Sequence, residues 1–402
     1  MTHSTSRHSL AAGAAALIAL MALQAVGAQQ NPQQRMKQYP YPSVRDQRGV
    51  IPTGPRVAPY NSPPLGEGPW SFETYEQRHI RVSVVAKGLG LPWSLAFLPT
   101  GEMLVTEKAG RLRVIRNGVL DPAPVAGTPE VTSRGTIAGL MDIALHPRFT
   151  ENHWVYIAYH KPRGTDVGAD GQEAPVASNA IMRGTWDGKA LTDVKDIFVS
   201  DDVDTEVSRL VFGRDGMLYM TIGGPGTGPM PSLIRPQHGN DYAGKTLRMR
   251  DDGSVPPDNP FVGRTDYKPL VWTMGHRNEL GLTLNPYSGE IWAGEQGPNG
   301  GDELNILRAG RNYGWPLVSD GRDYRGPYIS KSPYQEGMER PQVVFVPSIA
   351  ISSLMIYNGS RFPNWQRNAF VGGMREGEIA RSGQLVRIVF NDNWEELRRE
   401  PL

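Results

Sequence analysis

Two polar segments of the sequence carry side chains that could do chemistry together. Residues 275–282 read GHRNELGL, and residues 294–305 read GEQGPNGGDELN. Each borders an apolar run with strand character, so a hairpin between the two runs would bring both segments to one rim. A guanidinium, an amide and Gly-Pro backbone carbonyls gathered there suit a ligand that carries carboxylates together with a hard cation. On chemistry alone, a polar network that only fixes the packing of neighbouring sheets is an equal alternative.

The common catalytic signatures are missing from the chain. It contains no nucleophile elbow, no zinc-binding helix and no Walker loop. The glycine-rich residues 223–228 follow a strand, but Pro-Met-Pro comes next instead of a helix start, so they predict a loop and not a phosphate cradle. The absence of Cys excludes disulfides, thiolate metal sites and thiol nucleophiles. Hydroxyls, carboxylates, His, Arg or a bound cofactor must therefore supply any chemistry.

The elements that must position these residues are short strands. A unit of apolar run, Pro or Gly turn and second apolar run recurs five times, with equivalent points at Phe97, Leu145, Phe212, Leu284 and Ile356. Each unit predicts a β-hairpin. Intervals of 48 to 72 residues hold about four strands each, which is typical of the blades of a β-propeller. A β-sandwich is the alternative, but it would not restart one signature at such intervals.

The two ends of the repeat predict how the ring closes. Residues 79–86 (HIRVSVVA) form a strand with no hairpin partner upstream, and the chain stops a dozen residues after the strand-like residues 384–390. Ring closure would let this N-terminal strand complete a last blade whose inner strands come from the C-terminus. Those inner strands are missing from the sequence, so we expect the last blade to be incomplete at the C-terminus.

Composition excludes several classes of protein. Of the 402 residues, 46 are Gly and 34 are Pro, and both residue types disfavour helix interiors, which excludes a helical bundle, a coiled coil or a helical solenoid. The net charge of +1, from 42 basic and 41 acidic residues, offers no electrostatic footprint for nucleic acid. We therefore expect no nucleic-acid partner.

The N-terminal region predicts export. Residues 1–28 combine one firm positive charge, an apolar run and small residues before the end of the segment, which is typical of a cleaved signal peptide. An uncleaved membrane anchor is the alternative. We expect residues 29–75 to be an extended Pro/Gln-rich arm and residues 76–402 to be the β-propeller domain. The mature chain should have no membrane span and should be periplasmic or secreted.

A family resemblance becomes specific when the polar segments are taken in order. GHRNELGL, GEQGPNGGDELNIL and residues 310–316 (GRNYGWP) resemble the soluble sugar dehydrogenases that use pyrroloquinoline quinone (PQQ), the aldose sugar or glucose/sorbosone dehydrogenase family. The likeness extends over about residues 80–390. It implies a six-bladed β-propeller of four-stranded antiparallel blades. It also implies PQQ and Ca²⁺ as cofactors, a sugar substrate oxidised at its C1 hydroxyl to the lactone, and an external electron acceptor.

The resemblance also implies roles for individual residues. Arg277 and Asn278 would contact the quinone, and Arg277 would take part in catalysis. Gly297 and Pro298 would give backbone carbonyls to Ca²⁺. Arg375 stands where the family usually has a Lys that contacts the cofactor, and it keeps the positive charge with a different geometry.

Several positions depart from the family pattern. Thr205 stands where the family has a His that removes the proton of the sugar hydroxyl, and a threonine hydroxyl cannot accept a proton at neutral pH. Ile137 replaces a Gln that contacts the cofactor, and Gly224 replaces an Asp. Asp204 or Glu206 would substitute as the base if the loop register shifts by one residue.

Three interpretations follow from this pattern. The first is an exported PQQ-dependent sugar dehydrogenase. The second is a catalytically impaired propeller that binds a sugar, the quinone or a protein partner at the old axial site. The third is a truncated propeller that cannot close its ring and therefore exposes sheet edges.

Overall fold

The computed structural model describes residues 66–133, 137–167, 173–203, 205–206, 208–224, 230–324, 326–377, 379 and 381–402. The predicted signal peptide and most of the predicted arm lie outside these residues, and so does Asp204. The chain divides into two compact units. Ala58–Asp323 together with Tyr328–Leu402 form the unit that contains all the strands of the described residues.

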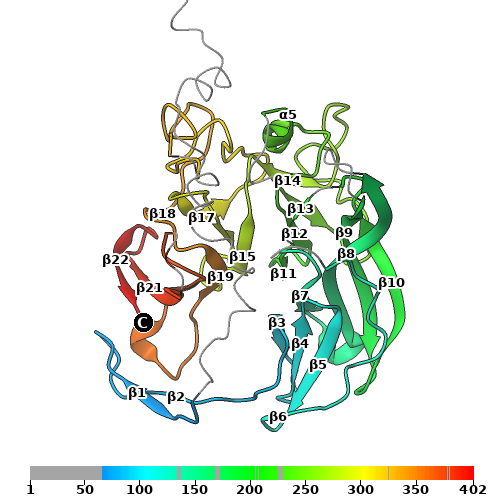
Figure 1. Ribbon diagram of the computed structural model, residues 1–402, viewed down its shortest axis with the longest axis vertical. Helices are drawn as coiled ribbons and strands as arrows, with labels where there is room; N and C mark the ends of the chain where they lie inside the picture. The colour runs from blue at the N-terminus through cyan, green and yellow to red at the C-terminus, as the bar shows by residue number, and fades with distance from the viewer. Residues whose placement is uncertain are drawn as a thin grey trace, which may run out of the picture. The chain divides into compact units, whose positions relative to one another are not determined.

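Five four-stranded antiparallel sheets, named here blades 1 to 5, follow one another along the chain (Figure 1). In each blade the strands pair in sequence order, so every blade is an up-and-down meander. Blade 1 contains β3 (Pro92–Phe97), β4 (Met103–Glu107), β5 (Arg111–Arg116) and β6 (Val119–Leu120). Blade 2 contains β7 (Leu140–Leu145), β8 (Trp154–Val167), β9 (Glu173–Trp186) and β10 (Leu191–Val199). Blade 3 contains β11 (Leu210–Phe212), β12 (Leu218–Ile222), β13 (Lys245–Met249) and β14 (Val271–Met274).

The last two blades have the same plan. Blade 4 contains β15 (Glu279–Leu284), β16 (Ile291–Glu295), β17 (Asp302–Leu307) and β18 (Val343–Phe345). Blade 5 contains β19 (Ile351–Ile356), β20 (Ala369–Gly373), β21 (Gln384–Phe390) and β22 (Glu396–Pro401). Helical turns are short: α4 (Phe149–Asn152), α5 (Met230–Leu233), η1 (Arg235–Gln237) and η2 (Pro363–Trp365). Within the described ranges, no helix has the length and apolar character needed to cross a bilayer.

The prediction of an all-β propeller is confirmed, but the expected number of six blades is wrong. The five equivalent points of the repeat each end the first strand of a blade, and the described residues contain five blades. The fifth blade has all four strands, so the expectation of an incomplete last blade is also wrong. The sequence does not predict the outer strand β22, because ELRREP is the sequence of an exposed edge strand without an apolar alternation.

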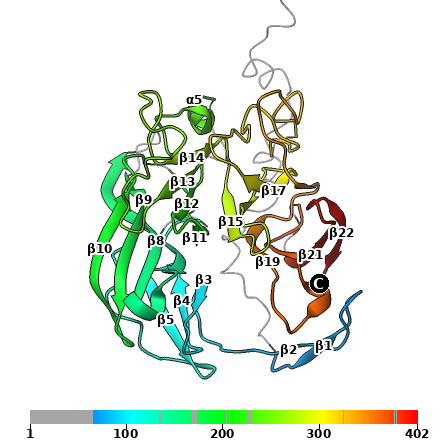
Figure 2. The ribbon, with the colours of Figure 1, turned by 180° about the vertical axis from the view of Figure 1, so that it is seen from behind.

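The N-terminal strand does not complete a blade either. β1 (Trp70–Phe72) pairs with β2 (Ile80–Val82) in a separate two-stranded sheet, which lies beside blade 5 in both views (Figures 1 and 2). The turn between them carries Glu76, which pairs with Arg387 and Arg398 of blade 5. The Arg387 side chain is only 1% exposed, and it also binds Glu400 at 2.7 Å.

Four hydrophobic clusters fill the interfaces between successive blades. One joins blades 1 and 2, a second joins blades 2 and 3, a third joins blades 3 and 4, and a fourth joins blades 4 and 5. Middle strands are therefore buried on both faces, as in β12, where all five residues are buried. Among the described residues, no cluster joins blade 5 to blade 1.

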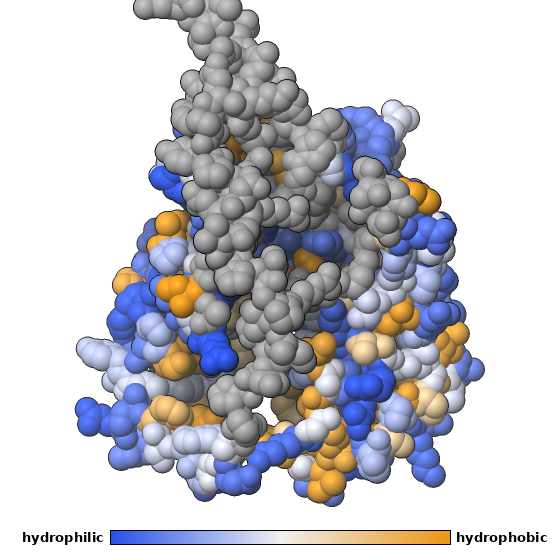
Figure 3. Space-filling model, in the orientation of Figure 1, coloured by the Kyte–Doolittle hydropathy of each residue, from blue (hydrophilic) through white to orange (hydrophobic). Residues whose placement is uncertain are grey.

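The outer faces of the first and fifth blades consequently carry exposed apolar side chains. On blade 1, Leu95 and Phe97 are 49% and 68% exposed, and apolar side chains gather over this blade in the space-filling view (Figure 3). On blade 5, Met355, Leu385 and Leu397 are exposed. Within the described part of the chain, the first and last blades thus each bury one face against a neighbour, and no blade stacks on the other face.

Candidate functional site

The two polar segments singled out in the sequence meet at one end of blade 4. Antiparallel pairing of β15 with β16 places Glu279 of the first segment opposite Glu295 of the second. The backbone N–H of Gln296 donates to the carbonyl of Asn278 at 2.9 Å. The hairpin predicted from the sequence therefore brings the segments together as expected.

Arg277 is held by contacts of its backbone N–H and of its guanidinium. Its backbone N–H donates to Oε1 of Glu295. Its Nη1 donates to the carbonyls of Gln296, at 3.0 Å, and Gly297, at 3.2 Å. The guanidinium carbon lies 5.4 Å from the ring centre of Trp315, and the residue is 5% exposed. A long cationic side chain is thus fixed in a single place beside an aromatic ring.

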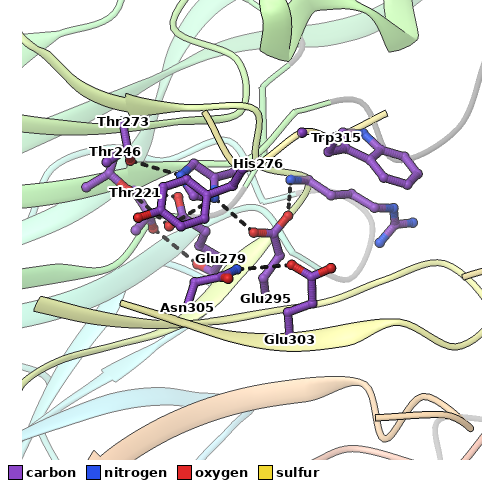
Figure 4. A network of polar contacts seen from close by, with 12 residues as sticks. Thr221, Thr246, Thr273, His276, Glu279, Glu295, Glu303, Asn305 and Trp315 are labelled. Atoms are coloured by element: carbon purple, nitrogen blue, oxygen red, sulfur yellow. Dashed lines mark hydrogen bonds and ion pairs between the residues drawn. The ribbon is translucent and has the colours of Figure 1, made fainter. Parts of the chain in front are cut away.

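His276 and Glu295 form a buried pair next to Arg277 (Figure 4). Nδ1 of His276 lies 2.9 Å from Oε2 of Glu295, and Nε2 lies 2.9 Å from the hydroxyl of Thr273. The ring stacks on Tyr313 with centroids 4.6 Å apart. Burial disfavours the charged imidazole, but Glu279 and Glu295 outweigh it and hold the pKa of His276 above its ordinary value.

Glu279 lies at the base of the same network and is fully buried. The hydroxyl of Thr246 lies 3.0 Å from each of its carboxylate oxygens, and its backbone carbonyl accepts from the hydroxyl of Thr221 at 3.1 Å. Burial raises the pKa of Glu279 to about 7, although the nearby His276 acts in the opposite direction. The buried carboxyl therefore binds its proton more tightly than an exposed Glu does.

Asp302 anchors the loop between β16 and β17. One carboxylate oxygen accepts from the N–H of Gly297, at 2.9 Å, and from the hydroxyl of Ser348, at 2.6 Å. The other accepts from the N–H groups of Ile349, at 3.0 Å, and Ile351, at 3.1 Å. Four donors on one buried carboxylate fix the loop of blade 4 against the start of blade 5.

Gly297 and Pro298, the expected calcium ligands, lie in this anchored loop. A side chain on Gly297 would collide with the carbonyls of Gly300 and Gly301, so only glycine fits there. The carbonyl of Gly297 accepts the hydrogen bond from Arg277 described above. In the described residues, no group of three or more His, Asp or Glu side chains is arranged to hold a metal ion. A cation here would rest on backbone carbonyls.

A small pocket opens beside Arg277. Its lining combines one cation, two carboxylates, glycine backbone and two aromatic rings: Arg277, Glu295, Gln296, Gly297, Gly301, Glu303, Tyr313, Trp315, Val318 and Ser319. Glu303 is half-buried, and its Oε2 accepts from Nδ2 of Asn305 at 3.1 Å. Burial, followed by the negative charge of Glu295, raises the pKa of Glu303 well above its ordinary value. The sequence alone did not assign a role to Glu279 or Glu303.

Thr205 is buried between blades 2 and 3 and is 2% exposed. Its hydroxyl donates to Oδ1 of Asn179 at 2.5 Å, and its carbonyl accepts from Nε2 of His160 at 3.1 Å. The next residue, Glu206, is half-buried and forms a backbone bridge with Gly223 at the end of β12. The Thr205 hydroxyl is thus committed to a structural contact.

The end of β12 connects this region with the Arg277 segment. The N–H of Gly224 donates to the carbonyl of Arg277 at 2.7 Å. A side chain on Gly223 would collide with Oδ1 of Asn278. The close approach of these two segments of the backbone therefore requires glycine. Ile137 is half-buried in the loop before β7.

Arg375 follows β20 and is half-buried. Its backbone N–H donates to the carbonyl of Ile349 at 3.2 Å, and Ile349 in turn binds Asp302. Arg375 is therefore connected through backbone to the loop of Gly297, whereas Arg277, Asn278 and Gly297 meet directly. Thr205, which was also expected in the site, lies between blades 2 and 3 and not at the end of blade 4.

Comparison with known proteins gives a consistent result. The family model described as Glucose / Sorbosone dehydrogenase matches residues 89–399. An uncharacterized protein of Synechocystis is 40% identical over 315 residues, which is 74% of each chain. An aldose sugar dehydrogenase of Escherichia coli is 34% identical over 75% of this chain and 79% of its own. The PQQ-bound aldose sugar dehydrogenase of Streptomyces coelicolor superposes with a TM-score of 0.61 and 26% identity, covering 80% of this chain and 84% of that one.

Proposed function

Because the chain belongs to the glucose/sorbosone dehydrogenase family, we propose that it is a PQQ-dependent enzyme that oxidises the C1 hydroxyl of an aldose to the lactone. The bound quinone supplies a two-electron oxidant that takes a hydride, and an external electron acceptor reoxidises it. The observation that carries the proposal is the fixed guanidinium of Arg277 in the pocket of blade 4. The predicted signal peptide would export the enzyme to the periplasm or beyond.

The residues around Arg277 fit a polyanionic quinone. Nε1 of Trp315 is a buried donor, and Oδ1 of Asn278 is a buried acceptor; neither has a hydrogen-bond partner among the described residues. Buried polar groups are usually paired. Nε1 of four other described tryptophans also lacks a partner, so these two atoms support a ligand here only in combination with the guanidinium of Arg277. Arg277 and Trp315 would donate to the carboxylate and quinone oxygens, and Arg375 would add a second cation. Asn278 would complete the polar wall.

Calcium is a further part of the proposal. Backbone carbonyls are hard oxygen ligands of the kind that Ca²⁺ takes, and Gly297 and Pro298 would supply them. The Gly297 carbonyl already accepts from Arg277. Cation binding would therefore compete with this hydrogen bond and release the guanidinium toward the anionic ligand. This coupling predicts that Ca²⁺ strengthens quinone binding.

A second candidate function is supported by Thr205. Its hydroxyl is buried and donates to Asn179, so the position of the family base offers no proton acceptor. A propeller that binds a sugar, the quinone or a protein partner without turnover would have this property. The two functions differ only in whether another group of the chain accepts the proton.

A quinone titration separates these candidates. The purified chain is titrated with PQQ in Ca²⁺ and in a chelator, and dye reduction is then followed across a panel of aldoses. Binding with turnover supports the enzyme, and binding without turnover supports the binding module. Arg277→Gln should lose quinone affinity, while Arg148→Gln, at an exposed ion pair with Glu151, serves as the matched control. Failure of the wild-type chain to bind PQQ with Ca²⁺ would refute both.

A further inference from the structure

We propose that Lys245 is a positioning residue: its ammonium fixes the loop of residues 235–244, and this loop holds Trp315 and the backbone of Arg277 in place. The loop begins with η1 and ends where β13 starts, and it is called the η1 loop below. The inference rests on the proposed PQQ-dependent function, because that function needs Arg277. It adds a residue of blade 3 that acts through other residues and not by contact with a ligand.

Lys245 is a fully buried cation whose hydrogen bonds go to the backbone of the η1 loop. Its Nζ donates to the carbonyls of Pro236, at 2.9 Å, and Ala243, at 2.8 Å. A third, longer hydrogen bond of 3.3 Å goes to the carbonyl of Arg235. The three donors of the ammonium are thus matched by three acceptors. Two of these acceptors begin the η1 loop and one lies near its end, so the ammonium ties the two ends together.

The η1 loop is bonded directly to the first of the two polar segments. The carbonyl of Pro236 accepts from the ammonium of Lys245 and also from the N–H of Gly275, at 3.1 Å. The carbonyl of Gly244 accepts from the N–H of His276 at 3.2 Å. The first two residues of the polar segment therefore donate to the η1 loop, and one of them shares its acceptor with the ammonium.

A side chain of the η1 loop reaches Trp315. Nε2 of Gln237 donates to the carbonyl of Trp315 at 2.7 Å, and its Oε1 accepts from Nδ2 of Asn312 at 2.7 Å. The N–H of Trp315 donates in turn to the carbonyl of Gly275 at 2.8 Å. The backbone of Trp315 is thus bonded both to the η1 loop and to the polar segment, and its indole lies beside the guanidinium of Arg277.

Two glycines bring the η1 loop into close contact with the backbone around Arg277. Gly244 has a φ of +63°, and a Cβ there would lie 2.3 Å from the carbonyl oxygen of His276. A Cβ on Gly224 would lie 2.8 Å from the ring of Pro236, and the N–H of Gly224 donates to the carbonyl of Arg277 at 2.7 Å. No side chain fits at either position, so backbone packs on backbone. A shift of the η1 loop would therefore displace Arg277.

The charge of Lys245 depends on its surroundings. Burial is the largest cause and lowers the pKa of Lys245 to about 7. Two carboxylates favour the ammonium and two cations disfavour it, namely Asp241, Asp202, Arg235 and Lys268. The buried imidazole of His276 also faces the ammonium, which acts against the charged form of the ring. The neutral amine has one N–H fewer for the three carbonyls, so the η1 loop should be held less firmly as the pH rises through 7.

The first test is the substitution Lys245→Met, which keeps an unbranched side chain and removes the charge. We expect PQQ to bind roughly tenfold more weakly at pH 6 in Ca²⁺, as for the loss of a hydrogen bond to a charged group. Hydrogen exchange at the amides of Gly275 and Trp315, measured without quinone, should become faster by a similar factor. Lys87→Met, at the exposed ion pair with Glu67, is the matched control and should change neither quantity.

The pH profile separates positioning from a purely structural role. Between pH 6 and 8 the wild type should lose quinone affinity as the ammonium loses its proton, and this loss should be smaller in Lys245→Met. The contribution of Lys245 to stability should rise over the upper part of the same range, because its folded-state pKa is lowered. A purely structural lysine would make the contributions to affinity and to stability change in the same direction, which would overturn the proposal.

The substitution Gln237→Met tests the next link without touching the buried cation. Gln237 is half-buried, and its replacement removes the hydrogen bonds to Trp315 and Asn312. We expect faster amide exchange at Trp315, little change at Gly275, and weaker binding of PQQ. If Lys245→Met does not fold, this variant and the wild-type pH profile decide the question. Unchanged exchange at Trp315 together with a flat pH profile would then overturn the proposal.

The outcomes distinguish the inference from the function on which it rests. A folded Lys245→Met variant that binds PQQ as tightly as the wild type, with unchanged exchange at Gly275 and Trp315, overturns the role of Lys245 and leaves the proposed function standing. A wild-type chain that does not bind PQQ in Ca²⁺ overturns the proposed function. The exchange of the two amides still shows in that case whether Lys245 holds the backbone around Arg277.

Discussion

Nδ1 of His276 lies 2.9 Å from Oε2 of Glu295, and the two side chains are 0% and 6% exposed. The other oxygen of Glu295 accepts the backbone N–H of Arg277. One carboxylate thus links a buried imidazole to the residue that the proposed function needs most. The pair is part of the packing between blades 3 and 4 and also part of the site.

Neutralising Glu295 should change the protonation of His276. In Glu295→Gln, the amide can still accept from Arg277 and can donate to Nδ1 of His276, which must then be unprotonated. We expect the pKa of His276 to fall, measured by NMR titration of its ring protons. Glu295→Ala should cost roughly 3–5 kcal/mol, because it leaves a buried group without its partner. A pKa of His276 that does not change in Glu295→Gln would show that Glu279 alone controls the ring.

Stability should decrease as the pH rises from about 4.5 to 7. The folded-state pKa of Glu279, about 7, lies above that of an unfolded Glu, so the folded chain binds more protons in this range. The raised pKa of His276 acts in the same direction once the pH rises above the ordinary His value of 6.5. Thermal melts at several pH values should show the decrease, and Glu279→Gln should flatten it. A variant with the wild-type slope would assign the effect to other groups.

Above pH 7, Lys245 should contribute to stability in the opposite direction. Its ammonium is fully buried and donates to the carbonyls of Ala243, at 2.8 Å, and Pro236, at 2.9 Å. Burial lowers its pKa to about 7, below that of an unfolded Lys. At this group the unfolded chain binds more protons between about pH 7 and 10, so the contribution of Lys245 to stability should rise with pH there. Urea unfolding at pH 7.5 and 9.5 measures this contribution, and Lys87→Gln, at the exposed ion pair with Glu67, is the control.

Thr205→Val should affect stability and not turnover. The substitution removes the hydrogen bond from the Thr205 hydroxyl to Oδ1 of Asn179, and the loss of one buried hydrogen bond costs roughly 0.5–1.5 kcal/mol. Thr205→Ser should retain most of the stability because it keeps the hydroxyl. Denaturant melts and steady-state kinetics on both variants test this. A Val variant that loses activity but keeps its stability would mean that the hydroxyl takes part in the reaction.

Asp302→Asn should loosen the loop that carries Gly297. The carboxylate accepts from four donors, and an amide nitrogen would face two of them. We expect a loss of about 2–4 kcal/mol in urea unfolding and weaker quinone binding at a temperature where the variant is folded. Asp266→Asn, at an exposed ion pair with Arg264, is the control. Unchanged quinone affinity would show that the hydrogen bonds of Asp302 are not needed for quinone binding.

The sequence predicted those parts of the fold that depend on local pattern. Apolar runs around a turn located the ends of the five first strands, because a buried strand next to a tight turn leaves a strong local signal. The same logic placed Arg277 beside Gly297. The number of blades was wrong because it was carried over from the family. The last blade was wrongly expected to be incomplete because an exposed outer strand such as β22 has little apolar signal.

The chemistry of Glu279 and Glu303 could not be predicted for a different reason. Their pKa shifts come from burial and from carboxylates on other strands, and the sequence separates Glu303 from Glu295 by a loop. Register decides such neighbours: Glu303 faces Glu295 only in the observed pairing of β16 with β17. A shift of one residue would turn the side chain to the other face of the blade.

Among the residues that the structure describes, blade 5 and blade 1 share no hydrophobic core, and this has a consequence for cooperativity. Five blades share four interfaces, so the stability of the stack behaves as a one-dimensional sum of blade and nearest-neighbour contributions, as in repeat proteins. Blade 4, which carries the site, packs against a blade on each of its two faces, while each outer blade packs against one neighbour. Amide exchange should therefore be slowest in β12 and β16 and fastest in β6 and β22, and partial unfolding should begin at the outer blades while the region of Arg277 stays folded.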